Sequence, residues 1–182
     1  MTLEQRLARV ELLLLDVDGV LTDGRVVLDD NGVESKFFDV RDGHGLKLLQ
    51  RAGVGVGLVT GRRSRVVELR AVELGVDEVH QGVKDKLTVV RRVLSRRDLS
   101  PERVAYVGDD VVDLPVMLQV GVAITVADAP GYIQERAHWV TTAGGGRGAV
   151  REVCEALLRA RGCWEEITAR YFSPEPLMSR DA

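Results

Sequence analysis

The chain has 182 residues, of which 45% are hydrophobic and 29% charged, and its net charge is −3. These values favour one globular domain with a substantial core, and they argue against a basic protein that binds nucleic acid. The apolar runs are too short to cross a membrane. Residues 1–10 are charged and amphipathic and lack the apolar core of a signal peptide, so we expect a cytoplasmic protein.

Short apolar runs alternate with amphipathic segments, which is typical of a parallel sheet with crossover helices. A short N-terminal helix is expected first, because Thr2 and Gln5 have the spacing of a capping box. The predicted strands are 11–16, 54–59, 77–80, 103–107 and 121–124, with a short one at 138–140. The predicted helices are 43–52, 64–74, 84–96, 110–119 and 148–161, with a helical turn opened by Ser100 and Pro101. The pattern predicts an α/β fold, a Rossmann-like doubly wound sheet that is mainly parallel.

The first buried strand ends in two aspartates. Residues 12–24 read LLLLDVDGVLTDG, so four leucines bring Asp16 and Asp18 to the carboxyl end of the strand. Ligands bind beyond this end of the strands in open α/β sheets. Two carboxylates this close repel each other unless a cation lies beside them, which indicates a divalent cation with oxygen ligands.

Residues 25–40 interrupt the alternation of strands and helices. RVVLDDNGVESKFFDV has apolar pairs on both sides of Asn31 and Gly32, which predicts a β-hairpin. The hairpin is too small to cover a site alone. Residues 37–45, FFDVRDGHG, join it to the first crossover helix. By themselves they fit a polar turn with helix caps as well as they fit a functional loop.

Two later segments place phosphate-compatible groups at the same edge of the sheet. In GLVTGR a strand ends at Thr60. A phosphate could bind the Thr60 hydroxyl, the free backbone N–H of Gly61 and the Arg62 guanidinium. The signal is weak alone, because many strands end in Thr-Gly. QGVKDK places Lys84 and Lys86 near a helix start, where the helix dipole disfavours cations. This placement indicates an anionic partner, with a solvated charge cluster as the alternative.

The predicted strand 103–107 ends within the segment AYVGDDVVDLPVM, residues 105–117. Asp109, Asp110 and Asp113 lie here within five residues at a predicted helix N-terminus. Helix capping explains one or two of these carboxylates and does not easily explain all three.

In this order the motifs resemble the haloacid-dehalogenase superfamily of phosphatases. DVDGVLTDG matches its DxDGxLTDG signature, Thr60 and Lys86 follow, and GDDVVD matches its metal motif GDDxxD. Receiver domains of two-component signalling also use acidic residues, a Thr and a Lys around Mg²⁺. There the acidic residues precede the Thr and the Lys, whereas here a second acidic cluster follows the Lys.

The resemblance implies roles for the residues that match these motifs. Asp16 is the expected nucleophile and Asp18 the general acid and base, while Thr60 and Lys86 are expected to stabilise the transferred phosphoryl group. The implied cofactor is Mg²⁺. Its expected ligands are the Asp16 carboxylate, the Asp18 backbone carbonyl and Asp109, with Asp110 and Asp113 in outer or substrate contacts.

A narrower resemblance covers roughly residues 10–162. The combination of motifs resembles the 3-deoxy-D-manno-octulosonate 8-phosphate phosphatases. The motifs are the hairpin, DVRDG at 39–43, VTGR, QGVKDK, AYVGDD and AGGGRGAVREVCE. Members of this family are Mg²⁺-dependent homotetramers of lipopolysaccharide precursor synthesis. Their hairpins join a central barrel and help to close a neighbour's site. A partner that excludes water suits a site without a cap.

Positions matched to this family are expected to contact the sugar phosphate. They are Asp18, Asp39, Val40, Arg41, Asp42, Gly43, Lys47, Gly61, Arg62, Arg70, Lys86 and Asp110. Arg62 and Arg70 are predicted to lie two turns apart on one helix and to face one anion. Arg147, within GGGRGAV, is either a mobile latch over a neighbouring site or part of a plain glycine loop.

Two alternatives to an octulosonate phosphatase remain open from the sequence. Some members of the family have Arg and Asn at the positions of Lys47 and Asp39. These differences leave the substrate open, and a sister group acts on nine-carbon sialic-type sugar phosphates. Arg62 favours the octulosonate. A non-catalytic accessory tetramerisation domain is the other alternative, and the presence of every catalytic position argues against it.

The predicted domain covers residues 1–162 and contains the hairpin insert at 25–40, and a tail follows at 163–182. We expect the tail to be partly disordered, above all in its last ten residues. Cys154 and Cys163 have neither a zinc-site nor a disulfide spacing, so two free thiols are expected.

Overall fold

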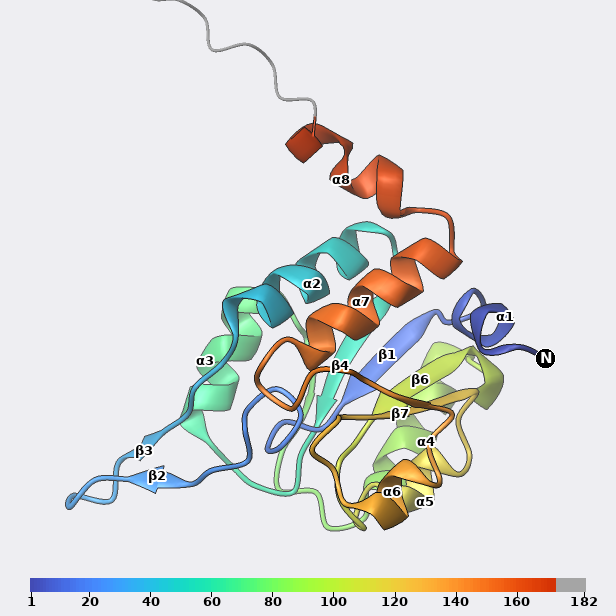
Figure 1. Cartoon of the computed structure of the whole chain (residues 1–182). Coiled ribbons are helices and arrows are strands. Elements are labelled where there is room, and N and C mark those ends of the chain that lie inside the picture. Colours follow the sequence, from blue (N-terminus) through green and yellow to red (C-terminus); the bar gives the residue numbers. More distant parts are fainter. Residues whose placement is uncertain (173–182) are drawn as a thin grey trace, which may run out of the picture.

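The computed structural model describes residues 1–172. The main sheet has six strands, and Figure 1 shows it between two layers of helices. Its strand order is β5-β4-β1-β6-β7-β8, and every neighbouring pair in it is parallel. The strands are β1 (Leu12–Leu15), β4 (Gly55–Val59), β5 (Glu78–His80), β6 (Val104–Val107), β7 (Val122–Thr125) and β8 (Trp139–Val140). All six strands of this sheet were predicted.

The direction of the chain decides which face each helix covers. From β1 the chain moves outward to β4 and β5, and then it crosses back to β6 and moves the other way. Because parallel crossovers are right-handed, the helices that follow β1 and β4 pack on one face of the sheet, and those that follow β5, β6 and β7 pack on the other (Figure 1). The helices are α1 (Leu3–Leu7), α2 (Val40–Arg51), α3 (Arg65–Leu74), α4 (Lys86–Arg97), α5 (Leu114–Met117), α6 (Gly131–Gln134), α7 (Ala149–Ala160) and α8 (Trp164–Phe172).

The central strands are apolar because both their faces are covered. The four leucines of β1 have no exposed surface, and β6 is equally buried. On the first face α7 packs beside α2 (Figure 1). The buried side of α7 has helical spacing, with Val150, Val153, Cys154, Leu157 and Leu158 facing the core.

The predicted hairpin is present and projects from the body of the molecule (Figure 1). Its strands β2 (Val27–Leu28) and β3 (Glu34–Ser35) are antiparallel. Asp29 holds the turn, because its Oδ1 accepts hydrogen bonds from the backbone N–H groups of Asn31 and Val33. Gly32 in this turn has a φ of 77°, a conformation that favours glycine.

Several local expectations are confirmed and others need correction. Thr2 and Gln5 form the capping box of α1, a 3₁₀ turn follows Ser100, and both cysteines are free. The predicted helix 110–119 was wrong in length, since only Leu114–Met117 is helical. Pro115 lacks an N–H and cannot lie inside a longer helix. Helix α2 begins at Val40, earlier than predicted, because the Asp39 side chain caps it.

The C-terminal part was predicted less well than the sheet. Helix α8 lies within the stretch that was expected to be a tail, and α6 was not predicted. The expectation for the last ten residues falls outside the described part of the chain. Within residues 1–172, no helix combines the length and the apolar character that a membrane crossing requires.

Candidate active site

The site lies where the sheet changes direction. β1 and β6 are neighbours, but their outgoing chains turn to opposite sides of the sheet and leave a crevice between them. Leu15 pairs with Val107, so the residues that follow the two strands emerge side by side. The Asp16 backbone N–H donates to the Val107 carbonyl at 2.9 Å. The register therefore places Asp16 next to the loop that begins at Gly108.

A pocket of about 330 Å³ opens at this crevice. Its lining comes from three loops and from the start of α4, four segments that are far apart in the sequence. The lining residues are Asp16, Asp18, Gly24, Thr60, Gly61, Arg62, Lys86, Asp109, Asp110 and Val112. The fold thus brings together all four predicted catalytic residues, the predicted metal ligands, and Gly61, Arg62 and Asp110 of the predicted substrate contacts.

Lys86 is the buried cation of this pocket. Its Nζ lies 2.9 Å from Asp16 Oδ2 and 2.6 Å from Asp113 Oδ1. Burial works against the charged amine, but Asp16 and Asp113 outweigh it and raise the pKa of Lys86. Lys86 therefore stays protonated at neutral pH. Lys84 is exposed, as expected for a solvated charge.

Asp113 shapes the loop between β6 and α5. It is fully buried, and the Tyr106 hydroxyl and Lys86 donate to its Oδ1 at 2.5 and 2.6 Å. Its Oδ2 accepts from the backbone N–H groups of Asp109 and Asp110, each at 3.2 Å. Both oxygens are therefore engaged, which makes Asp113 an anchor for the loop.

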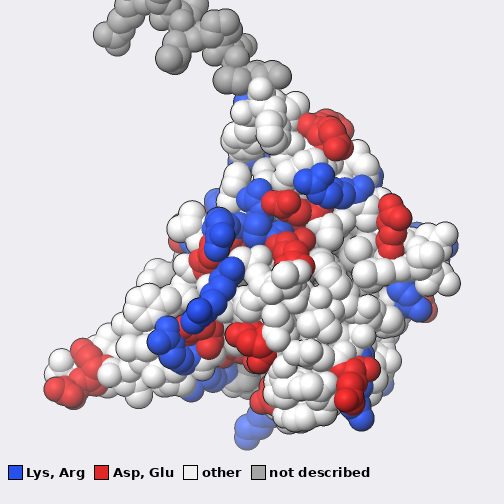
Figure 2. Space-filling view, in the orientation of Figure 1, with Lys and Arg blue, Asp and Glu red and all other residues white. Residues whose placement is uncertain are grey.

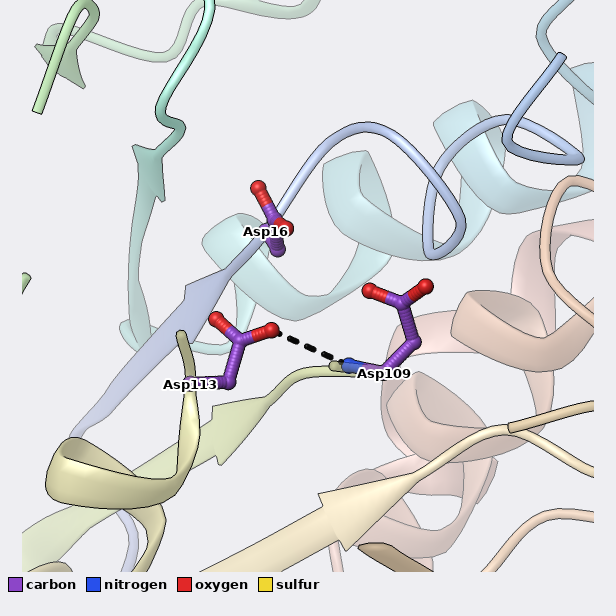
Figure 3. Close-up of side chains that lie close together, drawn as sticks. All are labelled: Asp16, Asp109 and Asp113. Atoms are coloured by element: carbon purple, nitrogen blue, oxygen red, sulfur yellow. Dashed lines mark hydrogen bonds between the residues drawn. The ribbon is translucent and has the colours of Figure 1, made fainter. Parts of the chain in front are cut away.

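Asp16 and Asp109 have the properties of cation ligands. Figure 3 shows them with Asp113, and the three offer oxygens that all lie within 4.8 Å of one another. Asp109 Oδ1 is buried and has no hydrogen-bond partner among the described residues. Burial, then the charges of Asp16 and Asp113, raise the pKa of Asp109 to about 7. Because Asp113 is already saturated, a hard divalent cation fits Asp16 and Asp109 best.

Two glycines allow the loops to approach each other. Gly19 has a φ of 90°, and a Cβ placed there would lie 2.0 Å from Asp109 Oδ2. A Cβ at Gly108 would lie 2.4 Å from the Cβ of Asp113. The glycines of DVDG and GDD are therefore needed for the close contact between the two acidic loops.

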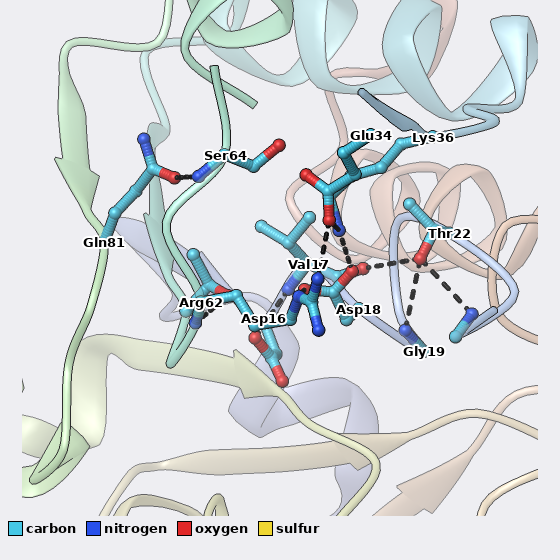
Figure 4. A network of polar contacts seen from close by, with 12 residues as sticks. Asp16, Val17, Asp18, Gly19, Thr22, Glu34, Lys36, Arg62, Ser64 and Gln81 are labelled. Atoms are coloured by element: carbon cyan, nitrogen blue, oxygen red, sulfur yellow. Dashed lines mark hydrogen bonds and ion pairs between the residues drawn. The ribbon is translucent and has the colours of Figure 1, made fainter. Parts of the chain in front are cut away.

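The base of the hairpin contributes a cation that the sequence analysis missed. The Lys36 side chain is 1% exposed and forms an ion pair with Asp18. Its Nζ also lies 3.4 Å from Glu34, which binds Arg62 at 2.7 Å. Figure 4 shows this group beside Asp16. The only signal in the sequence was a lysine two residues after a glutamate on a predicted strand.

Seven of the predicted substrate contacts do not line the pocket. They are Asp39, Val40, Arg41, Asp42, Gly43, Lys47 and Arg70. They gather around the N-terminal half of α2, where Lys47 donates to the Glu73 carbonyl and Arg70 stacks on Phe38. Asp42 is buried and accepts from the Arg151 backbone N–H at the start of α7. These contacts hold α2 against its neighbours.

The predicted pairing of Arg62 and Arg70 on one helix was wrong. Helix α3 begins at Arg65, and Arg62 lies in the loop before it. The Arg62 carbonyl accepts a hydrogen bond from the Gly82 N–H, which ties this backbone to the loop after β5. Arg62 can therefore point into the pocket, whereas Arg70 faces α2.

Comparison with known proteins agrees with this geometry. A family model described as haloacid dehalogenase-like hydrolase matches residues 37–121. The 3-deoxy-D-manno-octulosonate 8-phosphate phosphatase of Yersinia pestis is 46% identical over 90% of this chain and 88% of its own length. The chain belongs to this phosphatase family.

Solved structures of family members superimpose closely. The Yersinia pestis phosphatase has a TM-score of 0.88 and 46% identity, covering 89% of this chain and 88% of its own. The Moraxella catarrhalis phosphatase, solved with magnesium, phosphate and KDO, has a TM-score of 0.90 and 36% identity over 92% and 97%. The predicted superfamily, family and doubly wound fold are confirmed. The roles of single residues stay predictions.

Proposed function

We propose that this chain hydrolyses 3-deoxy-D-manno-octulosonate 8-phosphate to the free sugar acid and phosphate, in lipopolysaccharide precursor synthesis in the cytoplasm. The observation that carries the proposal is the contact of Asp16 with protonated Lys86, in one pocket with Asp18, Thr60 and Asp109. A carboxylate beside a fixed cation is suited to attack a phosphate monoester. The names of the relatives supply the substrate.

The proposed reaction has two steps. An Asp16 oxygen attacks phosphorus, the bond to the sugar oxygen breaks, and Asp18 gives its proton to that oxygen. A water molecule then attacks the aspartyl-phosphate while Asp18 takes its proton, which releases phosphate and restores Asp16. The Lys86 ammonium and the Thr60 hydroxyl stabilise the negative charge on the phosphoryl oxygens.

Mg²⁺ is the proposed cofactor. The Asp16 and Asp109 carboxylates and the Asp18 backbone carbonyl would hold it, consistent with the unpaired buried oxygen of Asp109. When bound, the ion neutralises charge on the phosphoryl oxygens and on the two carboxylates.

We further infer a homotetramer assembled through the hairpin. Figure 2 shows the hairpin as a largely uncharged projection with acidic side chains at its tip. Val26, Leu28, Val33 and Phe37 are 53%, 59%, 60% and 65% exposed. A two-stranded ribbon is marginally stable alone, and apolar residues on unpaired edges favour packing against other copies. Light scattering tests this: Leu28→Asp should dissociate the assembly.

The seven residues around α2 fit this assembly. In one chain they lie outside the pocket, so a contact with a ligand bound there would need the arrangement of the assembled subunits. We propose that they contact the sugar acid in the assembled tetramer, with Arg62 on the pocket side. Arg147 is 69% exposed, and its guanidinium lies 4.0 Å from Asp23, so both interpretations of this residue stay open.

The test of the function is phosphate release from a panel of substrates, with and without Mg²⁺. The panel contains the octulosonate 8-phosphate, a nine-carbon sugar acid 9-phosphate and hexose phosphates. A Mg²⁺-dependent preference for the first supports the proposal. Equal or faster turnover of the nine-carbon compound reassigns the substrate, and no turnover of any compound favours the accessory domain.

A further inference from the structure

Lys36 is a buried charge in an otherwise exposed hairpin. Glu34 and Lys36 are two residues apart, so they share one face of the strand, and this face turns toward the pocket (Figure 4). Phe37 on the opposite face is 65% exposed, whereas the Lys36 side chain is 1% exposed. Burying an ammonium costs several kcal/mol unless carboxylates surround it. Asp18 and Glu34 provide them here.

The contact with Asp18 is selective for one oxygen. Lys36 donates to Asp18 Oδ1, and Asp18 Oδ2 is buried with no hydrogen-bond partner among the described residues. Asp18 lines the pocket, and among the described residues no hydrogen bond to Oδ2 competes with a ligand for that oxygen. Lys36 therefore holds one carboxylate oxygen, while the other accepts no hydrogen bond from the described residues.

A chain of opposite charges fixes Lys36 in turn. Glu34 lies between Lys36 at 3.4 Å and the Arg62 guanidinium at 2.7 Å, and Arg62 Nε lies 3.9 Å from Asp18 Oδ2. These ion pairs join the base of the hairpin to the loops after β1 and β4 (Figure 4).

We propose that Lys36 is a positioning residue, which orients the Asp18 carboxyl group for proton transfer to and from the substrate. This inference rests on the proposed function. In this role Lys36 only holds the carboxyl group in place, and Asp18 gives a proton to the leaving sugar oxygen and regains one from the attacking water. Correct orientation of an acid is worth about 100-fold in rate when a displacement near 1 Å is prevented.

The leaving group separates positioning from simple stabilisation. A sugar alkoxide is a poor leaving group and needs the proton of Asp18, whereas nitrophenolate leaves without one. Lys36→Met keeps the length of the side chain and removes its charge. The value of kcat/KM reports the first phosphoryl transfer only, so it is the quantity to compare for octulosonate 8-phosphate and p-nitrophenyl phosphate.

We expect Lys36→Met to lower kcat/KM for the sugar phosphate about 30- to 100-fold, mostly through kcat, and for p-nitrophenyl phosphate less than about threefold. Lys36→Arg should restore most of the loss. The matched control is Lys84→Met, which removes an exposed lysine and should leave both values unchanged. Equal losses for both substrates, or a loss confined to KM, would overturn the inference.

A second variant covers the case in which Lys36→Met does not fold. Glu34→Gln keeps the shape of the residue and weakens its attraction for the Lys36 ammonium. It should therefore lower kcat/KM for the sugar phosphate more than for p-nitrophenyl phosphate, by a smaller factor than Lys36→Met. If wild-type protein prefers another sugar phosphate, the proposed function fails, and the ratio is measured with that substrate instead. A substrate-independent loss in Glu34→Gln would again count against positioning.

Discussion

Two carboxylate sites in this protein have opposite charge balance. Where β1 and β6 end, the carboxylates of Asp16, Asp109 and Asp113 lie around one buried cation, Lys86, which forms ion pairs with Asp16 and Asp113. On the edge strand β5, a single buried carboxylate, Glu78, has three basic partners, which are Arg96 at 2.6 Å, Arg97 at 3.1 Å and His80 at 2.5 Å.

The pKa values follow the balance of charge. Burial raises the pKa of Asp16 to about 6, with help from Asp113 and against the opposing charge of Lys86. Burial also acts to raise the pKa of Glu78, but the hydrogen bonds from Arg96, His80 and Arg97 outweigh it and hold the pKa at about 2. Carboxylate charge is thus neutralised at the edge strand and left in excess at the crevice, as a site for a cation and a phosphate requires.

The largest effect is expected for Asp16→Asn. Loss of the nucleophile should reduce phosphate release by about 10⁴-fold or more, because no other group can form the aspartyl-phosphate. The free energy of unfolding should not fall, since the change removes one charge from a crowded acidic cluster. Activity and thermal melts measure both, and Asp30→Asn on the exposed hairpin turn is the control. Substantial residual activity would refute the assignment of the nucleophile.

Asp109→Asn should abolish the stabilisation by magnesium. For wild type, Mg²⁺ at about 100 times its Kd should add about 2.7 kcal/mol to the free energy of unfolding. Melting with and without Mg²⁺ measures this shift, which the variant should lose. In metal-free buffer at pH 8 the variant should be at least as stable as wild type, because the pKa of Asp109 near 7 marks an unfavourable buried charge. An unchanged Mg²⁺ shift would exclude Asp109 as a ligand.

Glu78→Gln should have the opposite effect on stability. At pH 7 we expect a loss of about 2 kcal/mol, because the amide cannot replace the charged hydrogen bonds to two arginines. The folded pKa of about 2 lies below the ordinary value of 4.5, so this stability is present above pH 4.5 and is lost as the pH falls toward 2. Urea unfolding at pH 7 and pH 3 should show a smaller difference at the lower pH. A constant difference would mean that packing dominates.

The smallest effects are expected for the arginines around Glu78. Arg96 and Arg97 side chains are 60% and 37% exposed, so each contact is screened by solvent. Arg96→Met or Arg97→Met alone should cost about 1 kcal/mol or less, since the other partners remain. The double variant should cost more than the sum of the two single changes, and urea unfolding of the cycle measures this coupling. Additive losses would show that the two arginines act independently.

The predictable part of the fold depended on local patterns. All strands of the main sheet follow from short apolar runs, and the hairpin follows from Asn31 and Gly32. The predicted length of α5 was wrong because Pro115 cannot lie inside a helix that begins at residue 110, although the apolar pattern continues through it. The early start of α2 depends on a cap from Asp39, which the sequence admits without requiring.

The properties of the candidate site also differ in how far local sequence patterns predict them. The positions of Asp16, Thr60 and Asp109 at one edge of the sheet could be predicted from the sequence, because parallel strands bring their carboxyl ends to the same edge. The extent to which each charge is compensated could not be predicted, since it depends on burial and on partners from distant segments of the folded chain. The tertiary structure buried Lys36 against Asp18, saturated Asp113 and left an oxygen of Asp109 unpaired. Electrostatic balance is a property of three-dimensional packing, and no spacing of residues along the chain encodes it.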